Sequence, residues 1–493
     1  MVVVDASAAL AWLLESQSTA ASEKFLARST EFWLIAPDIF LWEVHNAMLT
    51  VERRGRLPSG AHLRASSLIE QYAIKIATPF TAEEVSVQAE IARSLGLSLF
   101  DSAYLTLAQD LSCDLASRDG NLIKVATENG VFCYDLRDVG THMTDPEVQI
   151  FLDGAVGRIT LNRPSALHAL TTNMCVLITD ALVTWLDNPI VKLVMIDHSG
   201  ERGFCAGGDI RMLAESGAGD GVAARKFFFI EYRLNHLLFE YPKPVIVIMD
   251  GVTMGGGVGL AAPARYRVAT ERTTYAMPET GIGLFPDVGG GWFLPRMPGH
   301  IGLWLALTGA RIKAADCELV GIATDFIESG KIAEFKAAVV ADPAAVETIL
   351  TEFEGDAGRP PLATHQDEID RLFGAADVEK IAAGLERANT DWARDQLRVL
   401  ATKSPQTLKV AFRQLALGGV AKSFAENMAM EYAIGARVVQ RHDFLEGVRA
   451  VIVDKDNAPK WNPPRLEDVT EVMLDEIFSP LPSAEAWSPL IGL

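Results

Sequence analysis

The sequence has few cysteines and no motif that would pair them. The five are Cys113, Cys133, Cys175, Cys205 and Cys317, without CxxC or Cys/His spacing. This spacing indicates neither a disulfide framework nor a zinc site. The first residues also lack the basic start, apolar middle and cleavage site of a secretory signal. We therefore expect a cytoplasmic location, where thiols stay reduced.

Long hydrophobic runs and excess basic charge are missing as well. No apolar stretch approaches the roughly 18 residues that cross a bilayer, so we expect no membrane contact. There are 44 Lys and Arg against 64 Asp and Glu, a net charge of −20. That charge opposes non-specific adsorption to nucleic acid or anionic lipid. Locally, basic side chains, backbone amides or a metal ion can still hold a phosphate-bearing ligand.

The chain is too long for one ordinary core. Its 493 residues exceed the roughly 100 to 200 of a single domain. Two patterns of alternating strands and helices are separated where Gly140 and Pro146 break both periodicities. We predict an N-terminal α/β unit at 1–138, a linker at 139–146 and a C-terminal α/β unit at 147–493. Met143 resembles a natural start, which would fit two adjoining genes read as one chain.

Four acids of the first unit stand in apolar surroundings. A strand at 2–4 and helices at 6–15, 38–53 and 98–111 are expected from the hydrophobic pattern. The acids Asp5, Glu43, Asp101 and Asp119 lie at strand ends or on apolar helix faces. An unpaired carboxylate is costly to bury, and Mg²⁺ bound by carboxylates and water would compensate the charge. Taken singly, each acid is better explained structurally, Asp5 and Asp101 as helix caps, Glu43 as a solvated side chain and Asp119 as part of a turn.

The sequence around these acids is more specific than each acid alone. The segments are VVVDASA (2–8), LWEVHNA (41–47), LFDSAYLTLA (99–108) and ASRD (116–119). Together they resemble PIN domains, in particular the VapC-type toxins of bacterial toxin and antitoxin pairs. The resemblance implies an α/β/α fold and a Mg²⁺-dependent ribonuclease, with RNA as substrate and an antitoxin protein as partner. It also implies that the four acids bind the metal, with Ser7 as a neighbour of the site.

The second unit has two glycine-rich loops that each follow an expected strand. Strands are predicted at 149–152, 157–161, 193–196 and 245–249, then a loop at 250–257 and a helix at 259–264. The loops contain FCAGGD (204–209) and MGGGVGL (254–260). Glycines let a ligand approach the backbone, and two preorganised N–H groups stabilise the oxyanion of acyl transfer. Glycine-rich turns of this kind also serve for packing or for holding a nucleotide.

Five motifs of the second unit occur in the order of the crotonase superfamily. They are LNRP (161–164), FCAGGD (204–209), KPV (243–245), GGG (255–257) and MPETGIGLFPDVGGG (277–291). IEYRLN (230–235), LFPDVGGG (284–291) and FLEGVRA (444–450) with DKD (454–456) are similar to the 3-hydroxyisobutyryl-CoA hydrolase branch. The resemblance implies a ClpP/crotonase-like fold with C-terminal helices, which commonly mediate oligomers in relatives. It implies an acyl-CoA substrate and no required cofactor.

The same resemblance assigns roles to five residues. Gly208 and Gly256 match the oxyanion-hole amides, and Glu231, Glu279 and Asp287 match substrate-contacting or catalytic acids. An ionised Glu279 either attacks the thioester carbon or acts as general base on water. Asp287 either holds a substrate hydroxyl or helps to protonate the thiolate. Glu231 either bonds the acyl end or lies on a solvated helix face.

We therefore expect hydrolysis of a short branched β-hydroxyacyl-CoA, most simply 3-hydroxyisobutyryl-CoA to 3-hydroxyisobutyrate and CoA, as in valine breakdown. The alternatives are enoyl-CoA hydration or isomerisation, and a toxin-type ribonuclease with an inactive acyl-CoA-binding module. No Gly-x-Ser-x-Gly elbow occurs, which disfavours a Ser-His-Asp thioesterase. Gly259 stands where crotonase hydratases carry a second glutamate, which favours hydrolysis over hydration.

Overall fold

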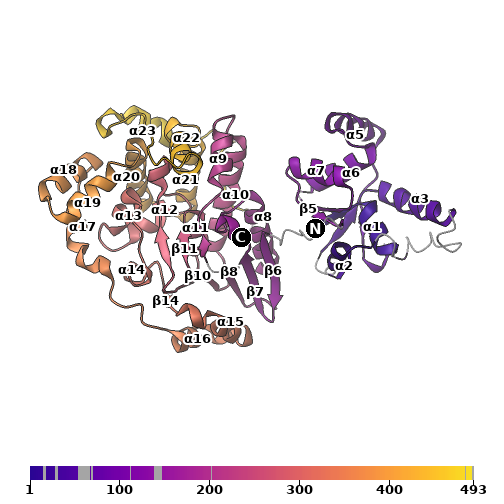
Figure 1. Cartoon of the computed structure of the whole chain (residues 1–493), viewed down its shortest axis with the longest axis horizontal. Coiled ribbons are helices and arrows are strands. Elements are labelled where there is room, and N and C mark those ends of the chain that lie inside the picture. Colours follow the sequence, from indigo (N-terminus) through magenta and orange to yellow (C-terminus); the bar gives the residue numbers. More distant parts are fainter. Residues whose placement is uncertain are drawn as a thin grey trace. The chain divides into compact units, whose positions relative to one another are not determined.

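A computed structural model describes residues 1–14, 18–27, 32–53, 67, 70–111, 113–137, 147–200, 202–483 and 485–490. The chain divides into two compact units, Met1–Asp145 and Pro146–Leu493 (Figure 1). The predicted linker at 139–146 lies outside the described residues, as do Glu15 and Asp138. The domain limits given above therefore stay a prediction.

The N-terminal unit is built on a five-stranded parallel sheet. Its strands are β1 (Val2–Val4), β2 (Leu34–Ala36), β3 (Lys75–Ile76), β4 (Asp114–Ser117) and β5 (Cys133–Asp135). Their order in the sheet is β3-β2-β1-β4-β5, so the apolar β1 is central. Every residue of β1 is buried, as expected of a strand covered on both faces.

Helices connect these strands and carry the cluster of acids. They are α1 (Ala6–Leu13), α2 (Ala20–Ala27), α3 (Ile39–Arg53), α5 (Ala82–Leu95), α6 (Leu99–Asp110) and α7 (Gly120–Glu128). Local sequence fixes several starts: Thr81 and Glu84 form a capping box at α5, and Ser98 caps α6. Asp5 and Asp119 cap α1 and α7. These two acids therefore lie where β1 and β4 end and the next helices begin, whereas Glu43 lies within α3 and Asp101 in the first turn of α6.

The C-terminal unit contains a six-stranded sheet in the order β14-β12-β10-β8-β7-β6. The strands are β6 (Val148–Asp153), β7 (Val156–Leu161), β8 (Leu193–His198), β10 (Val245–Met249), β12 (Tyr266–Ala269) and β14 (Asp325–Phe326). β6 and β7 form an antiparallel pair, and the other neighbours are parallel. Alternate residues of β10 enter two different apolar clusters, Val247 in one and Ile246 in the other. The sheet is thus covered on both faces.

A second sheet of three parallel strands supports the glycine-rich loops. It has the order β13-β11-β9, with β9 (Gly203–Cys205), β11 (Val252–Met254) and β13 (Thr274–Ala276). The strand β11 lies inside the segment 250–257 that the sequence predicted as loop, so that prediction was wrong. The following helix, α11 (Gly256–Ala261), also begins three residues earlier than predicted.

Helices surround both sheets of this unit and form its C-terminal part (Figure 1). The first α-helices of the unit are α8 (Thr172–Leu186), α9 (Ile210–Gly217) and α10 (Val222–Phe239). The later helices are α12 (Gly290–Phe293), α13 (Ile301–Thr308), α14 (Ala314–Leu319), α15 (Ile332–Ala341), α16 (Val346–Phe353), α17 (Gln366–Phe373), α18 (Val378–Ala388), α19 (Asp391–Leu400), α20 (Pro405–Val420), α21 (Phe424–Val438), α22 (His442–Val448) and α23 (Glu471–Phe478). The apolar residues of α15 and α16 pack on one face of the six-stranded sheet.

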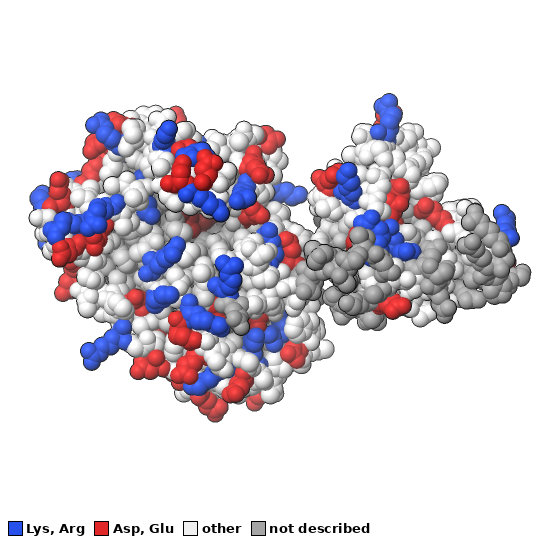
Figure 2. All heavy atoms as spheres, in the orientation of Figure 1, with Lys and Arg blue, Asp and Glu red and all other residues white. Residues whose placement is uncertain are grey.

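The surface of the described residues carries both signs of charge. On the face shown in Figure 2, Lys and Arg side chains stand among Asp and Glu side chains. Within the described part of the chain, none of the helices is long and apolar enough to cross a membrane.

Candidate active site

Two backbone loops of the C-terminal unit meet at the ends of neighbouring strands. β9 leads into Gly207 and Gly208, and β11, which pairs with β9 in parallel, leads into Gly255 and Gly256. Gly207 has φ +123° and Gly255 φ +48°, conformations that side chains disfavour. A Cβ added at Gly255 would lie 3.2 Å from the Cα of Gly207. The two loops are therefore in contact, and glycine makes that contact possible.

The amides of Gly208 and Gly256 both reach the same pocket. Neither N–H donates a hydrogen bond to another described residue, and both glycines line the cavity. Gly256 is also the first residue of α11, where backbone N–H groups have no partner within the helix. Two such donors in one pocket have the arrangement needed to stabilise an oxyanion. The structure thus brings together the two glycines predicted from the sequence.

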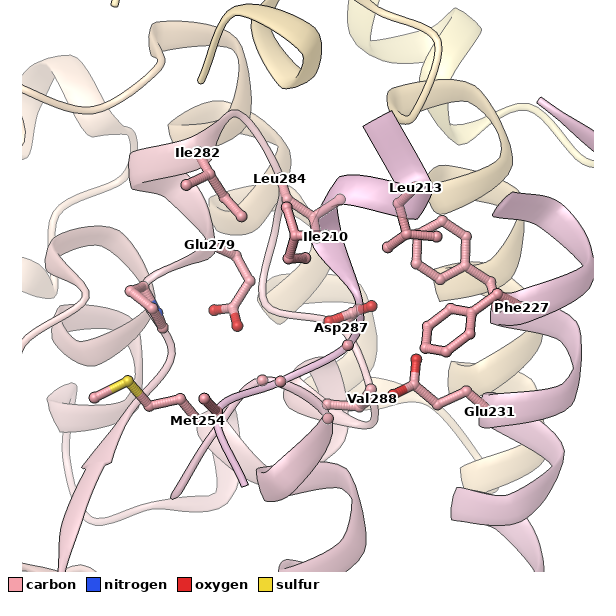
Figure 3. A pocket seen from close by; sticks show the side chains of 17 residues that line it. Ile210, Leu213, Phe227, Glu231, Met254, Glu279, Ile282, Leu284, Asp287 and Val288 are labelled. Atoms are coloured by element: carbon pink, nitrogen blue, oxygen red, sulfur yellow. The ribbon is translucent and has the colours of Figure 1, made fainter. Parts of the chain in front are cut away.

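Three buried carboxylates from different elements line this pocket (Figure 3). Glu231 comes from α10, Glu279 begins the 3₁₀ helix η5 (Glu279–Ile282), and Asp287 lies in the turn before α12. Their exposed fractions are 2%, 4% and 5%, so Glu231 is not on a solvated helix face. The cavity has a volume of about 70 Å³ and an otherwise apolar lining that includes Phe227 and Leu284.

The carboxylates differ in how they are bonded. The Tyr232 hydroxyl donates a hydrogen bond to Oδ2 of Asp287 at 2.8 Å. By contrast, Oε1 of Glu231 and Oε2 of Glu279 have no hydrogen-bond partner among the described residues. A Cβ added at Gly256 would lie 2.6 Å from Oε1 of Glu231, so this acid closely approaches the oxyanion loop. Two buried acceptor oxygens are therefore left for a substrate or water to satisfy.

Burial controls the protonation of these acids. It raises the pKa of Glu279 well above its usual value, the charge of Asp287 raises it further, and the Lys403 ammonium partly opposes the shift. Burial and the charge of Asp287 also raise the pKa of Glu231. The pKa of Asp287 is raised by burial, against the hydrogen bond from Tyr232. Burial thus favours the protonated form of Glu279, whereas a nucleophile or base must be ionised.

The acids of the N-terminal unit accept hydrogen bonds from other residues of the same unit. Asp5 is 4% exposed, and its carboxylate accepts hydrogen bonds from Ser7 Oγ, Ser117 Oγ and the Ala8 amide. Burial raises the pKa of Asp5 to about 6, partly opposed by these hydrogen bonds. The Ser7 hydroxyl, which donates to Asp5, also accepts a hydrogen bond from the Arg118 amide.

The other three acids follow two different patterns. Tyr104 donates a hydrogen bond to Oε2 of Glu43 at 2.6 Å, and the charge of Asp101 adds to burial in raising the pKa of Glu43. Glu43 in turn contributes to the raised pKa of Asp5. Asp119 instead accepts the Asn121 and Leu122 amides at the start of α7. Glu43 is therefore close enough to Asp5 and to Asp101 for their charges to repel, while one oxygen of Asp119 caps α7.

A divalent cation would relieve that repulsion, and its oxygen ligands would be these acids. Among the described residues, however, no group of three or more His, Cys, Asp or Glu side chains is placed to hold a metal ion. The repulsion between the acids is consistent with a bound cation, whereas the positions of their side chains do not form a set of metal ligands. The metal-site assignment of Asp5, Glu43, Asp101 and Asp119 stays a prediction.

Two residues that act on the acids of the main pocket were not predicted from the sequence. Tyr232 bonds Asp287, and Lys403 acts on Glu279 from the segment between α19 and α20. Tyr232 directly follows Glu231, so the predicted helix should have drawn attention to it. Lys403 is more than a hundred residues from the other site residues, and no spacing rule connects it to them.

Family comparisons agree with this division of the chain. The enoyl-CoA hydratase/isomerase family matches residues 156–478, and the PIN domain family matches residues 2–128. The chain therefore belongs to the enoyl-CoA hydratase/isomerase family and carries an N-terminal PIN domain. The predicted fold classes, PIN-like α/β/α and crotonase with C-terminal helices, are confirmed.

Within that family, the chain is similar to proteins named 3-hydroxyisobutyryl-CoA hydrolase, mitochondrial. The zebrafish (Danio rerio) protein is 46% identical over 337 residues, covering 66% of this chain and 88% of its own length. The human (Homo sapiens) protein is 42% identical over 353 residues, covering 69% of this chain and 91% of its own length. The expected resemblance to this branch is confirmed.

Solved structures also match the C-terminal unit. A carnitinyl-CoA dehydratase from Mycobacterium thermoresistibile is 39% identical, with TM-score 0.66, and the match covers 68% of this chain and 97% of that one. An enoyl-CoA hydratase from Rhodobacter sphaeroides is 40% identical, with TM-score 0.65, and the match covers 69% and 99% of the two chains.

Proposed function

We propose that the C-terminal unit hydrolyses a short branched β-hydroxyacyl-CoA thioester, with 3-hydroxyisobutyryl-CoA as the specific substrate. The observation that carries the proposal is one pocket lined by Glu279 and by Gly208 and Gly256, whose N–H groups donate no hydrogen bond to another described residue. The names of the zebrafish and human relatives support the choice of substrate.

The site residues suggest the following order of events. The amides of Gly208 and Gly256 donate hydrogen bonds to the thioester oxygen and stabilise its negative charge as the carbonyl carbon becomes tetrahedral. Glu279 either attacks that carbon itself or removes a proton from the attacking water. The C–S bond then breaks, and CoA leaves as a thiolate that takes up a proton. If an anhydride with Glu279 forms, water cleaves it and regenerates the carboxylate.

Asp287 and Glu231 are proposed to handle the rest of the substrate. Asp287 is fixed by Tyr232 and lines the pocket, where it can bond the substrate hydroxyl or supply the proton to the thiolate. Glu231 lies against Gly256 and has a free buried oxygen, which can accept a hydrogen bond from the acyl end. The unbonded oxygens of Glu231 and Glu279 would then be satisfied only when substrate and water are present.

Hydration of an enoyl-CoA is the main alternative, because the two solved relatives are named as a hydratase and a dehydratase. The surroundings of Gly259 argue against it. A Cβ added at Gly259 would lie 2.7 Å from Nδ2 of Asn235 and 2.7 Å from Cβ of Val288. The space for a second acid at this position is therefore filled. Adding water across a double bond needs one group for the water and one for the α-carbon proton.

Free thiol release over a panel of acyl-CoA esters tests the proposal. We expect 3-hydroxyisobutyryl-CoA to be cleaved fastest and crotonyl-CoA to be hydrated negligibly. Straight-chain esters are the control for the branch of the acyl group, and esters without the hydroxyl are the control for the hydroxyl group. Efficient hydration of crotonyl-CoA would favour the alternative, and no thiol from any ester would indicate an acyl-CoA-binding module.

We propose in addition that the PIN domain cleaves RNA with Mg²⁺. The repulsion of Glu43 with Asp5 and with Asp101 supports this, because a cation bound among these acids would lower it. An antitoxin protein is the partner to test first, since VapC-type chains pair with one. A cytoplasmic location and a homo-oligomer formed through the C-terminal helices complete the proposal.

A further inference from the structure

Another buried acid of the C-terminal unit does not line the pocket but contacts the turn that carries Asp287. Glu431 on α21 is 0% exposed. Its Oε1 accepts hydrogen bonds from the Gly291 amide at 2.8 Å, Asn427 Nδ2 at 2.9 Å and Gln414 Nε2 at 3.0 Å, and its Oε2 accepts the Gly289 amide at 2.8 Å. Burial raises the pKa of Glu431 to about 7, and these hydrogen bonds oppose the shift.

The two amides belong to the turn that carries Asp287. Val288 has φ +50° and Gly289 has φ +93°, so two successive residues adopt the left-handed conformation. For Val288 this conformation is strained, and it persists only where the surroundings enforce it. Both Asp287 and Val288 line the pocket. The direction of the Asp287 side chain therefore depends on keeping this turn in place.

Glu431 and Gln414 hold the turn on both sides of Asp287. Gln414 Nε2 donates to the Pro286 carbonyl at 2.6 Å as well as to Glu431. Gly289 and Gly291 are the N-cap and second residue of α12, where free N–H groups and the helix dipole favour an anion. An ionised carboxylate is suited to this place because it only accepts hydrogen bonds, and each of the four groups bonded to Glu431 donates one.

We propose that Glu431 is a positioning residue for the thioester reaction, which acts by fixing the turn that aims Asp287 into the pocket. The inference rests on the proposed hydrolysis. Asp287 is then held from two directions, by the Tyr232 hydroxyl on its carboxylate and by Glu431 through the backbone that follows it.

Glu431→Gln is the smallest substitution that breaks this arrangement of hydrogen bonds. The new NH₂ group must face either the Gly289 amide or the three donors at Oε1, so at least one donor meets a donor. A displacement of about 1 Å at a reacting group costs on the order of 100-fold in rate. We expect Glu431→Gln to lower kcat/KM for CoA release roughly 10- to 100-fold.

A double-mutant cycle separates positioning from a general structural role. Asp287→Asn, Glu431→Gln and the double variant are compared in kcat and KM for CoA release. If Glu431 acts through Asp287, both single variants change the same parameter, and Glu431→Gln has little further effect in the Asp287→Asn background. The same loss in both backgrounds, or wild-type kcat/KM in folded Glu431→Gln, would overturn the inference.

Asp316→Asn is the matched control, because Asp316 is 6% exposed and accepts the Leu362 amide outside the pocket. It should lower thermal stability and leave kcat/KM near the wild-type value.

If Glu431→Gln does not fold, Gln414→Met is used instead, because it removes one hydrogen bond to Glu431 and one to Pro286 and introduces no competing donor. We expect a roughly 3- to 10-fold loss that again disappears in the Asp287→Asn background. An inactive wild type would refute the proposed hydrolysis, whereas an active wild type without coupling refutes only the role of Glu431.

Discussion

The two units treat their buried acids differently. In the PIN domain, Asp5 accepts hydrogen bonds from two serines and an amide, and Glu43 accepts one from Tyr104. In the C-terminal pocket, Glu231 and Glu279 each keep one buried oxygen without a partner among the described residues. Burial raises the pKa in both units, so the difference lies in the hydrogen bonds.

This difference separates a pocket prepared for a ligand from a cluster that is bonded internally. Leaving a buried acceptor unsatisfied costs about 1–3 kcal/mol, more when it is charged, and that cost is recovered if a bound molecule donates the missing bond. Glu279 fits this description. Asp5 can bind a cation only by redirecting or sharing oxygens, because both of its carboxylate oxygens already accept hydrogen bonds. We therefore expect the two sites to respond differently to substitution.

The largest effect is expected for Glu279→Gln. Removing the base or nucleophile should lower CoA release from 3-hydroxyisobutyryl-CoA by roughly two to four orders of magnitude while substrate still binds. Steady-state rates and a binding titration measure the two quantities. Asp5→Asn, in the other unit, is the control and should leave this rate unchanged. Near-normal release by Glu279→Gln would remove Glu279 from the reaction.

The corresponding change in the PIN domain is Asp5→Asn. We expect the wild type to cleave single-stranded RNA only with Mg²⁺ or Mn²⁺, and the variant to lose cleavage, because one negative charge fewer weakens cation binding. Gel analysis of RNA products measures this. Glu90→Gln, on the exposed face of α5, should cleave normally. Undiminished cleavage in excess chelator would contradict a metal mechanism, and no cleavage in any metal would indicate a degenerate domain.

A smaller effect is expected in the pH profile of CoA release. Because the pKa of Glu279 is raised, its carboxylate becomes ionised only as the pH rises through that raised value. We therefore expect kcat/KM to increase over this pH range and to be low at lower pH. Lys403→Met removes the positive charge that opposes the shift. The rising limb should therefore move to higher pH, by roughly one unit. Lys409→Met, at a lysine paired with Glu379, is the control and should not move it. A shift to lower pH would contradict the assignment of the limb to Glu279.

The smallest effect should come from separating the units. The described residues form two compact bodies, each with its own apolar core. A chain beginning at Met143 should stay soluble and keep its rate of CoA release within about twofold of the full chain. Aggregation of this chain, or a large loss of rate, would show that the predicted boundary is misplaced.

Much of the fold was predictable because long apolar segments carry their own pattern. The five-residue strand β10 was predicted with its observed ends. The strand β11 was missed because Val252–Met254 has three residues between glycines, and its partners Gly203 and Thr274 are distant in sequence. The early start of α11 was missed because glycine is a weak helix former, and here tertiary contacts outweigh that preference.

The main pocket was predictable to the extent that its residues lie in recognisable motifs. Gly208, Gly256 and Glu279 are brought to one cavity. Glu431 was missed although it stands in an apolar helix segment, the same signal that drew attention to Glu43. It lies outside the crotonase motifs and 144 positions after Asp287, and only the folded backbone shows that the two are linked.

The support of the two oxyanion amides has a consequence for how this enzyme can change. Gly208 and Gly256 follow adjacent parallel strands, whose spacing of about 4.8 Å is set by backbone hydrogen bonds. Replacing side chains around the cavity leaves that spacing as it is, whereas inserting or deleting one loop residue shifts an amide by about 3.3 Å. Recognition of the thioester carbonyl thus depends on the path of the main chain and not on the side chains around the cavity. The surrounding acids can be exchanged one at a time, and a new reaction can arise on the same carbonyl site without rebuilding it.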